Sequence, residues 1–159
     1  MDAENTEISL IQDNMENIFL ALRAATHIST MYSKNLEKEF GVTLGQLLCL
    51  RTLLKKNSLS INDISKHVLV SPSTVTGIVD RLQEKGLVKR MRFSEDRRIV
   101  HVVISDMGRQ VVHSARGPIQ RLLANHFKKL ALEELQVISE GLVILLEFIK
   151  TVEVSSIDL

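Results

Sequence analysis

The sequence contains one cysteine, two prolines and no tryptophan, and aromatic residues make up only 4% of its 159 residues. A single cysteine cannot close an internal disulfide, which favours a reducing compartment. Uninterrupted apolar runs such as Leu142–Leu146 are a handful of residues long, far short of the roughly 20 that a membrane-spanning helix needs. The acidic N-terminus also lacks the basic start and apolar stretch of a signal peptide. We therefore expect a cytoplasmic protein with no membrane partner.

The chain also has few of the features that enzymes and metal sites require. Its seven glycines are scattered and form no phosphate-binding loop, and no nucleophile, base and orienting group stand at a motif spacing. The histidines show no ligand-like spacing, and one cysteine adds little to them. These histidines are His27, His67, His101, His113 and His126. We therefore predict no enzymatic activity, no metal site and no cofactor.

Charge is distributed unevenly along the chain, although the net charge is only +1. Residues 1–17 hold five acidic residues and no lysine or arginine, and residues 130–159 hold six acidic residues and one lysine. The stretch between them therefore carries a net charge of +11. This separation suggests a basic surface for a polyanion, flanked by segments with another role. On charge alone, a chance clustering of solvated faces explains the pattern equally well.

Helical periodicity is the main structural signal in the first half of the chain. Apolar residues at three- and four-residue steps predict a long amphipathic helix over Ile8–Phe40, with a break near Ser33 and an end at Gly41. Residues 43–55 start with the Thr-x-x-Gln pattern of a capping box and form the next helix. Residues 60–67 start with Ser-x-x-Asp and form a shorter one.

The helix predicted over Ser71–Lys85 has two distinct faces. It starts with an N-cap serine followed by proline and is ended by Gly86. Because a turn of about three residues separates it from the preceding helix, the pair has the outline of a helix-turn-helix. An apolar face is expected to meet the core: Val75, Ile78, Val79 and Leu82. The N-cap and the opposite face are small and polar: Ser71, Ser73, Thr74, Thr76, Gly77, Asp80 and Arg81.

The small polar face predicts contact with DNA. It lets the helix backbone approach closely, and hydroxyl groups can contact phosphates or base edges. An ordinary surface helix usually carries pairs of lysine and glutamate instead. The alternative is a solvated face that happens to be small.

A basic hairpin follows the helix-turn-helix. Residues 87–92 and 99–104 are rich in β-branched side chains and flank a polar turn at residues 93–98, so we predict a hairpin wing. Between Arg81 and Arg98 seven lysines or arginines face three acidic residues. A cationic hairpin tip suits the narrow minor groove of DNA, whose negative potential attracts arginine.

The sequence SPSTVTGIVDRLQEKGLVKR at residues 71–90, with the Asp-Arg-Arg turn at 96–98 and the Ser-x-x-Gly at 105–108, resembles the MarR (multiple antibiotic resistance regulator) family. The resemblance spans roughly residues 42–110. It implies a homodimeric winged helix-turn-helix regulator that binds palindromic double-stranded DNA, often a repressor released by a small ligand or an oxidant. Where the family usually has Leu-Thr, this chain has Ile104-Ser105, which keeps a good N-cap.

The resemblance also assigns roles in the wing. In the family the second arginine of the turn commonly enters the minor groove and the aspartate holds it in place. Those roles fall on Arg98 and Asp96, and we include Arg97 among the candidate DNA contacts.

A small aromatic or acidic effector is a further implication of the resemblance. His27, Tyr32 and Arg90 are the candidate contacts in the pocket between the lobes. No motif marks that pocket, so a structural role for each residue is the alternative. Whether DNA binding represses or activates transcription also stays open.

The only cysteine, Cys49, lies in the apolar stretch Leu-Leu-Cys-Leu. Such surroundings bury a thiol and raise its pKa, so we interpret Cys49 as a core residue. The alternative is a redox switch like those of the peroxide-sensing branch of the family. The sensing cysteine of that branch lies in the N-terminal helix, where this chain has none.

Two outer helices complete the prediction, one from Ser105 to about Lys129 with a kink at Pro118, and one over Ala131–Lys150. Their apolar stripes, with that of the N-terminal helix, are broader than one small winged domain could cover, and they resemble the family's dimerisation lobe. We expect a mainly α fold in which residues 41–104 form the winged helix-turn-helix and residues 1–40 and 105–159 form a helical dimerisation region. A winged helix that serves only protein contacts is the rival interpretation.

Overall fold

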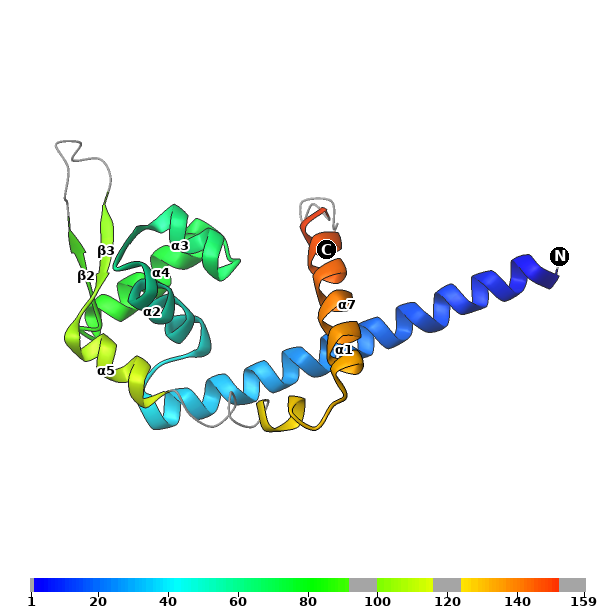
Figure 1. The fold of residues 1–159 in the computed structure, drawn as a ribbon. Helices are drawn as coiled ribbons and strands as arrows, with labels where there is room; N and C mark the ends of the chain where they lie inside the picture. The colour runs from blue at the N-terminus through cyan, green and yellow to red at the C-terminus, as the bar shows by residue number, and fades with distance from the viewer. Residues whose placement is uncertain (1, 92–99, 116–123, 152–159) are drawn as a thin grey trace. The chain divides into compact units, whose positions relative to one another are not determined.

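The computed structural model describes residues 2–91, 100–115 and 124–151, and for residues 2–5 it describes the backbone only. These residues form several helices and one small antiparallel sheet (Figure 1). The chain divides into two units, Met1–Arg116 and Gly117–Leu159. The mainly α fold expected from the sequence is confirmed.

Helix α1 (Asp2–Phe40) is one continuous helix of 39 residues, blue to cyan in Figure 1. The break expected near Ser33 is wrong. The Ser33 hydroxyl accepts a hydrogen bond from the backbone N–H of Leu44, 3.0 Å away, so it does not compete for the backbone groups of α1. The predicted end is confirmed, because Gly41 has a φ of +67° and its N–H donates to the carbonyl of Glu37.

Three helices of the first unit begin where the sequence predicts a side-chain cap. Helix α2 (Leu44–Lys56) starts at a complete capping box, in which Thr43 Oγ1 accepts from the N–H of Gln46 and Gln46 Oε1 accepts from the N–H of Thr43. Helices α3 (Ile61–Val68) and α4 (Pro72–Glu84) start in a similar way at N-cap serines. Each cap satisfies an N–H that has no partner inside its helix.

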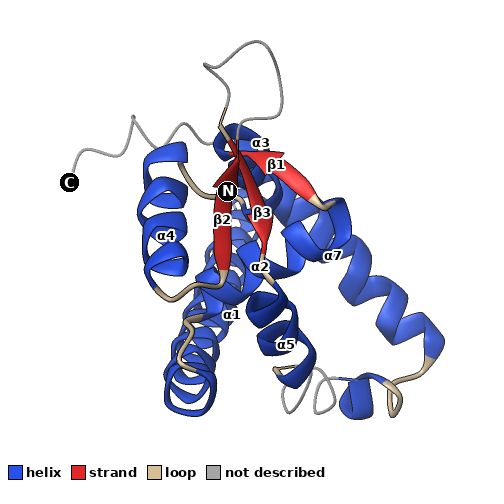
Figure 2. Cartoon of the chain, turned by 90° about the vertical axis from the view of Figure 1, so that its left-hand side faces the viewer, coloured by secondary structure: helices blue, strands red, loops and turns tan. Residues whose placement is uncertain are grey.

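The sheet has three antiparallel strands in the order β1-β3-β2 (red in Figure 2). Strands β2 (Val88–Met91) and β3 (His101–Ile104) are the predicted wing strands, and Val88 lies opposite Ile104. Strand β1 (Ser58–Ser60) pairs with β3 and was not expected from the sequence. Three residues are too few to show the alternation by which strands are recognised.

Helix α5 (Asp106–Ser114) starts at the predicted N-cap, Ser105, but ends much earlier than expected. The prediction of a helix reaching Lys129 is wrong, because the backbone leaves the helix at Ala115. The carbonyl of Ala115 accepts a hydrogen bond from Arg51 Nη2 at 3.3 Å, which gives a helix-end carbonyl a partner outside the helix. The kink predicted at Pro118 lies outside the described residues.

Helix α7 (Leu132–Thr151) is the main element of the second unit and confirms the predicted last helix. It buries none of its residues in this single copy of the chain. Its large exposed apolar side chains are Leu132, Val137, Ile138, Leu142, Val143, Ile144, Leu146, Phe148 and Ile149. No helix in the described ranges is long and apolar enough to cross a membrane.

In the first unit, α1 also exposes an apolar face over most of its length. The exposed side chains are Ile8, Leu10, Ile11, Met15, Ile18, Phe19, Leu20, Ile28 and Met31. Monomeric proteins rarely expose contiguous apolar patches of this extent, and a large patch usually marks an interface.

The hydrophobic core lies in the first unit and joins the end of α1 to α2–α5 and the sheet. Its fully buried side chains include Leu47, Leu50 and Leu53 of α2 together with Ile64 of α3. Cys49 is part of this core, and burial raises the pKa of its thiol to about 11. The expectation of a buried core cysteine is therefore confirmed.

Gly108 explains why the Ser-x-x-Gly sequence opens helix α5. A Cβ atom at this position would overlap the carbonyl oxygen of Leu87 and press on the side chain of Ile104. The same junction holds hydrogen bonds from Ser105, whose N–H donates to the Leu87 carbonyl and whose hydroxyl donates to the Gly86 carbonyl. The start of α5 is therefore packed directly against the chain that leaves α4.

We expect Gly108→Ala to lower the free energy of unfolding by about 1–3 kcal/mol or more, because the added methyl group meets backbone that cannot move cheaply. Gly77→Ala is the matched control, since a Cβ there has nothing within 4 Å. It should raise the free energy of unfolding by about 0.5–1 kcal/mol, as alanine favours helices over glycine. Urea unfolding at equal protein concentration measures both, and equal values for Gly108→Ala and wild type would contradict the close packing.

Candidate nucleic-acid interface

The orientation of helix α4 about its own axis is set by its buried side. Val75, Val79 and Leu82 are completely excluded from solvent, and Ile78 packs against the same core. These positions repeat at helical spacing, so the opposite side of α4 faces outward. The two faces predicted for this helix are confirmed.

The outward side of α4 carries the small polar residues expected from the sequence. Ser71, Ser73, Thr74, Thr76 and Arg81 are exposed, whereas Gly77 and Asp80 are half-buried. The structure therefore brings all seven α4 candidates together on one helix. Roles for these residues in DNA binding remain a prediction.

The hydroxyl groups on α4 are oriented by hydrogen bonds within the helix. Ser71 Oγ lies 2.9 Å from Ser73 Oγ and 2.8 Å from Thr74 Oγ1, and the Thr76 hydroxyl donates to the Pro72 carbonyl at 2.9 Å. A hydroxyl that donates its only hydrogen keeps its oxygen lone pairs free as acceptors. Thr76 is therefore suited to accept a hydrogen bond from a base amino group, and less suited to donate one to a phosphate.

Gly77 is half-buried on the outward side of α4, at a helix position where glycine is the least favourable residue apart from proline. Its backbone φ is not positive, and no neighbouring atom would touch a Cβ added there. Neither conformation nor packing therefore requires glycine at this position. A glycine here would allow another molecule to approach the helix backbone closely.

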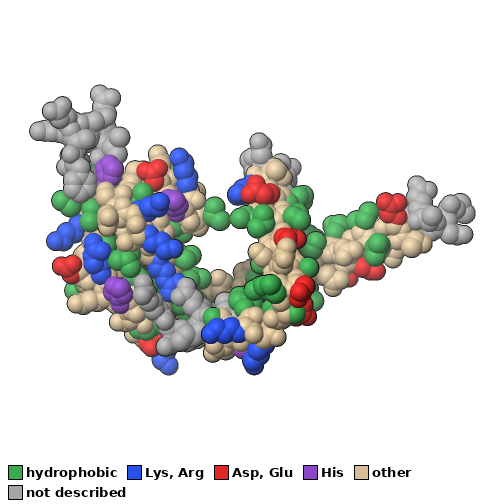
Figure 3. Space-filling view, viewed as in Figure 1, with side chains coloured by type: hydrophobic (Ala, Val, Ile, Leu, Met, Phe, Trp, Pro, Cys, Tyr) green, Lys and Arg blue, Asp and Glu red, His purple; other side chains and the backbone are tan. Residues whose placement is uncertain are grey.

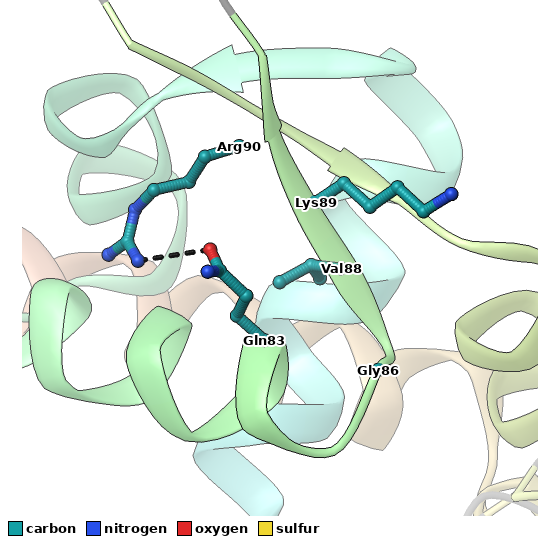
Figure 4. A pocket seen from close by; sticks show the side chains of 5 residues that line it. All are labelled: Gln83, Gly86, Val88, Lys89 and Arg90. Atoms are coloured by element: carbon teal, nitrogen blue, oxygen red, sulfur yellow. Dashed lines mark hydrogen bonds between the residues drawn. The ribbon is translucent and has the colours of Figure 1, made fainter.

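Arg90 on β2 connects the wing to helix α4. Its guanidinium donates to Asp80 Oδ1 at 2.6 Å and to Gln83 Oε1 at 3.1 Å. Figure 4 shows the Arg90 and Gln83 side chains pointing toward each other, while Lys89 points away on the other side of the strand. Gln83 was not predicted from the sequence, although its position three residues after Asp80 places both on one side of the helix.

These contacts border an open pocket of about 420 Å³, lined by Gln83, Gly86, Val88, Lys89 and Arg90 (Figure 4). Of the three effector candidates, only Arg90 lines it. His27 is exposed on α1, and Tyr32 of α1 packs partly buried against the core. The prediction that these three residues share an effector site stays untested.

Basic side chains gather on the part of the first unit that contains α4. Figure 3, which shows the side of this part opposite to α4, has lysines and arginines among its visible side chains, whereas the N-terminal half of α1 shows acidic and apolar side chains. Among the predicted wing-tip contacts, Asp96, Arg97 and Arg98 lie outside the described residues. Strand β2 ends at Met91 and strand β3 begins at His101, on either side of this part of the sequence.

Comparison with known proteins supports the resemblance noted in the sequence. The profile of the MarR family matches residues 42–100. The HTH-type transcriptional repressor MdtR of Bacillus subtilis (strain 168) is 32% identical over 122 residues, which cover 76% of this chain and 78% of MdtR.

Two solved structures illustrate the shared fold. The S. aureus MepR–DNA complex matches with a TM-score of 0.74 at 20% identity, covering 82% of this chain and 96% of the MepR chain. Bordetella bronchiseptica BpsR, solved to explain regulation of its DNA binding by 6-hydroxynicotinic acid, matches with a TM-score of 0.68 at 22% identity, covering 81% and 98%. A winged helix-turn-helix fold is therefore established for this chain.

We expect Gly77→Ala to weaken DNA binding although it stabilises the fold. A methyl group on the face that approaches the groove should cost about 1–3 kcal/mol of binding free energy, comparable to one mismatched base pair. Fluorescence anisotropy with a bound DNA duplex measures the affinity, and urea unfolding of the same sample gives the stability. Unchanged affinity would show that the DNA backbone or bases do not come close to Gly77.

We expect Arg90→Met to weaken DNA binding more than Asp80→Asn does, because it leaves the Asp80 carboxylate without its cation beside a polyanion. The double variant should bind more tightly than Arg90→Met alone. Lys89→Met is the control, since it removes the same charge from the same strand without releasing Asp80. Both members of the pair are partly exposed, so stability should change by less than about 1 kcal/mol. Additive losses in a double-mutant cycle would contradict this role of the pair.

Proposed function

This chain belongs to the MarR family of helix-turn-helix transcriptional regulators, and we propose that it acts as a homodimer that binds a palindromic operator and represses transcription until a small ligand releases it. The observation that carries the proposal is the outward face of α4, which is small, polar and held by a buried apolar stripe. An α-helix of this size fits the major groove of B-DNA.

The proposed DNA contacts fall into two groups. The first is the outward side of α4, comprising Ser71, Ser73, Thr74, Thr76, Gly77, Asp80 and Arg81. The second is the wing tip, comprising Asp96, Arg97 and Arg98, which rests on the sequence resemblance alone. The first group would read base edges in the major groove, and the second would enter the adjacent minor groove.

The exposed apolar faces support dimerisation. Helices α1 and α7 each expose nine large apolar side chains in a single copy of the chain, and a second copy would cover such surfaces in a two-fold interface. Residues 1–40 and 105–159 are the proposed dimerisation region, and residues 41–104 the DNA-binding region. A two-fold dimer places its recognition helices about one DNA turn apart, roughly 34 Å.

A small aromatic or acidic molecule is the proposed effector. The regulation of BpsR by 6-hydroxynicotinic acid gives a precedent among proteins of the same fold. The proposed contacts are His27, Tyr32 and Arg90. An anionic ligand at Arg90 would compete with Asp80 for the guanidinium, and it would regulate DNA binding through its different affinity for the free and the DNA-bound protein.

Selection of DNA from a random pool tests the proposed function. The selected site should be an inverted repeat with half-site centres about 10 base pairs apart, and sedimentation should show a dimer at micromolar concentration. Affinity should fall steeply with salt, because phosphate contacts release counterions. A monomer, a selected site without two-fold symmetry, or absence of salt-dependent DNA binding would contradict the proposal, and the last result would favour a winged helix that binds only proteins.

A further inference from the structure

The ends of α1, α2 and α4 meet at one lysine, Lys85, which follows the last residue of α4. Lys85 is the C-cap residue of α4, and its ammonium group donates to the carbonyl of Gly41 at 2.6 Å and to Oε1 of Gln46 at 3.2 Å. Gly41 directly follows α1, and Gln46 lies in the first turn of α2. The Lys85 side chain therefore links the C-terminal end of α4, the proposed recognition helix, to the end of α1 and the start of α2.

The acceptors of Lys85 are themselves firmly held. Gln46 is only 3% exposed, and its Oε1 also accepts from the N–H of Thr43 at 3.1 Å as part of the capping box. The next residue after Thr43, Leu44, donates its N–H to Ser33 of α1. The ammonium group thus binds at a junction where α1 and α2 are already joined by a hydrogen bond.

The backbone around Lys85 is equally well defined. The Lys85 N–H donates to the carbonyl of Arg81, the Gly86 N–H to Gln83, and the Leu87 N–H to Leu82. These bonds hold the backbone of Lys85 to the last turn of α4. Any restraint on the position of the Lys85 ammonium group is therefore also a restraint on the position of α4. A cation beside the carbonyl end of α1 is also favoured by the dipole of that helix.

We infer that Lys85 is a positioning residue, which sets the angle between α4 and α1 and thereby the distance between the two recognition helices of the dimer. This inference rests on the proposed function, because it takes α1 as part of the dimer contact. Helix α1 is continuous over 39 residues and is roughly 58 Å long at 1.5 Å per residue. A small change in the angle between α4 and α1 therefore produces a large displacement of α4 relative to the far end of α1. Lys85 thus affects which half-site spacing the dimer prefers by positioning α4, and it makes no contact with DNA.

The competing role for a lysine near a recognition helix is direct contact with a phosphate. The two roles differ in what they change. Loss of a phosphate contact lowers the salt slope of binding by about one unit and weakens all sites alike. Loss of a positioning contact leaves the salt slope unchanged and reduces the preference for one half-site spacing over others.

The test compares Lys85→Met with two matched substitutions. Methionine keeps most of the apolar stem and removes the donor. Arg81→Met removes a cation from the outward face of α4, and Lys34→Met removes an exposed cation from α1. Affinities are measured over a salt series for the selected operator and for versions with one or two base pairs inserted or deleted between the half-sites.

For wild type and Lys34→Met we expect a sharp preference for the selected spacing. Lys85→Met should lose roughly threefold to tenfold in affinity for that spacing, the range expected for the net loss of one ordinary hydrogen bond, and should bind the altered spacings nearly as well as the selected one. Its salt slope should match that of wild type. Lys85→Arg should restore the preference, because a guanidinium can donate to the same two oxygens.

The spacing preference should also depend on Gln46, the side-chain acceptor of Lys85. Gln46→Met removes this acceptor and leaves the Gly41 carbonyl, so it should lose part of the preference, and in the double variant with Lys85→Met the losses of spacing preference should not add. Two results for Lys85→Met would overturn this inference and leave the proposed function intact. One is a salt slope lowered by one unit with an intact spacing preference, and the other is behaviour equal to that of Lys34→Met. A wild-type protein that shows no spacing preference would overturn the two-fold dimer proposal as well.

Discussion

The burial of one side of α4 is the constraint on which the outward surface depends. Val75, Val79 and Leu82 are fully excluded from solvent, and burying a side chain of this size contributes roughly 1.5–3 kcal/mol. Turning α4 by one residue position would expose this stripe and carry hydroxyl groups into an apolar core, where a polar group without a partner costs free energy. The packing of the core therefore determines which side chains of α4 face solvent, independently of any ligand.

Polar contacts at the end of α4 add what the core cannot supply. Hydrophobic burial is non-directional and tolerates small changes in the tilt of a helix, whereas hydrogen bonds depend on distance and angle. Arg90 holds α4 from the side of the wing through Asp80, and Lys85 holds it from the side of α1 through Gly41. Burial thus sets which face of the helix is outward, and these two cations restrict how that face is tilted.

Local signals were readable from the sequence, and contacts between distant residues were not. The capping box at residues 43–46, the N-cap serines and the two faces of α4 depend on neighbours within one or two turns, so the sequence was sufficient to predict them. The end of α5 is held by Arg51, which is 64 residues from Ala115. Strand β1 exists because it pairs with β3, more than 40 residues later. The same limit explains why Lys85 was read only as part of a motif, since its acceptor Gly41 is 44 residues away.

The open space around Gly77 has a consequence for how this protein can diverge. Mutations that change specificity usually disturb the core or the backbone as well, and most of them destabilise the fold. At Gly77 no neighbouring atom lies within 4 Å of a new Cβ, and any residue except proline favours the helix more than glycine does. Under the proposed function, a side chain acquired there would alter the surface that meets DNA and would strengthen the fold as well. Under the same proposal, duplicated copies of such a gene could acquire new operator preferences without first accumulating compensating mutations.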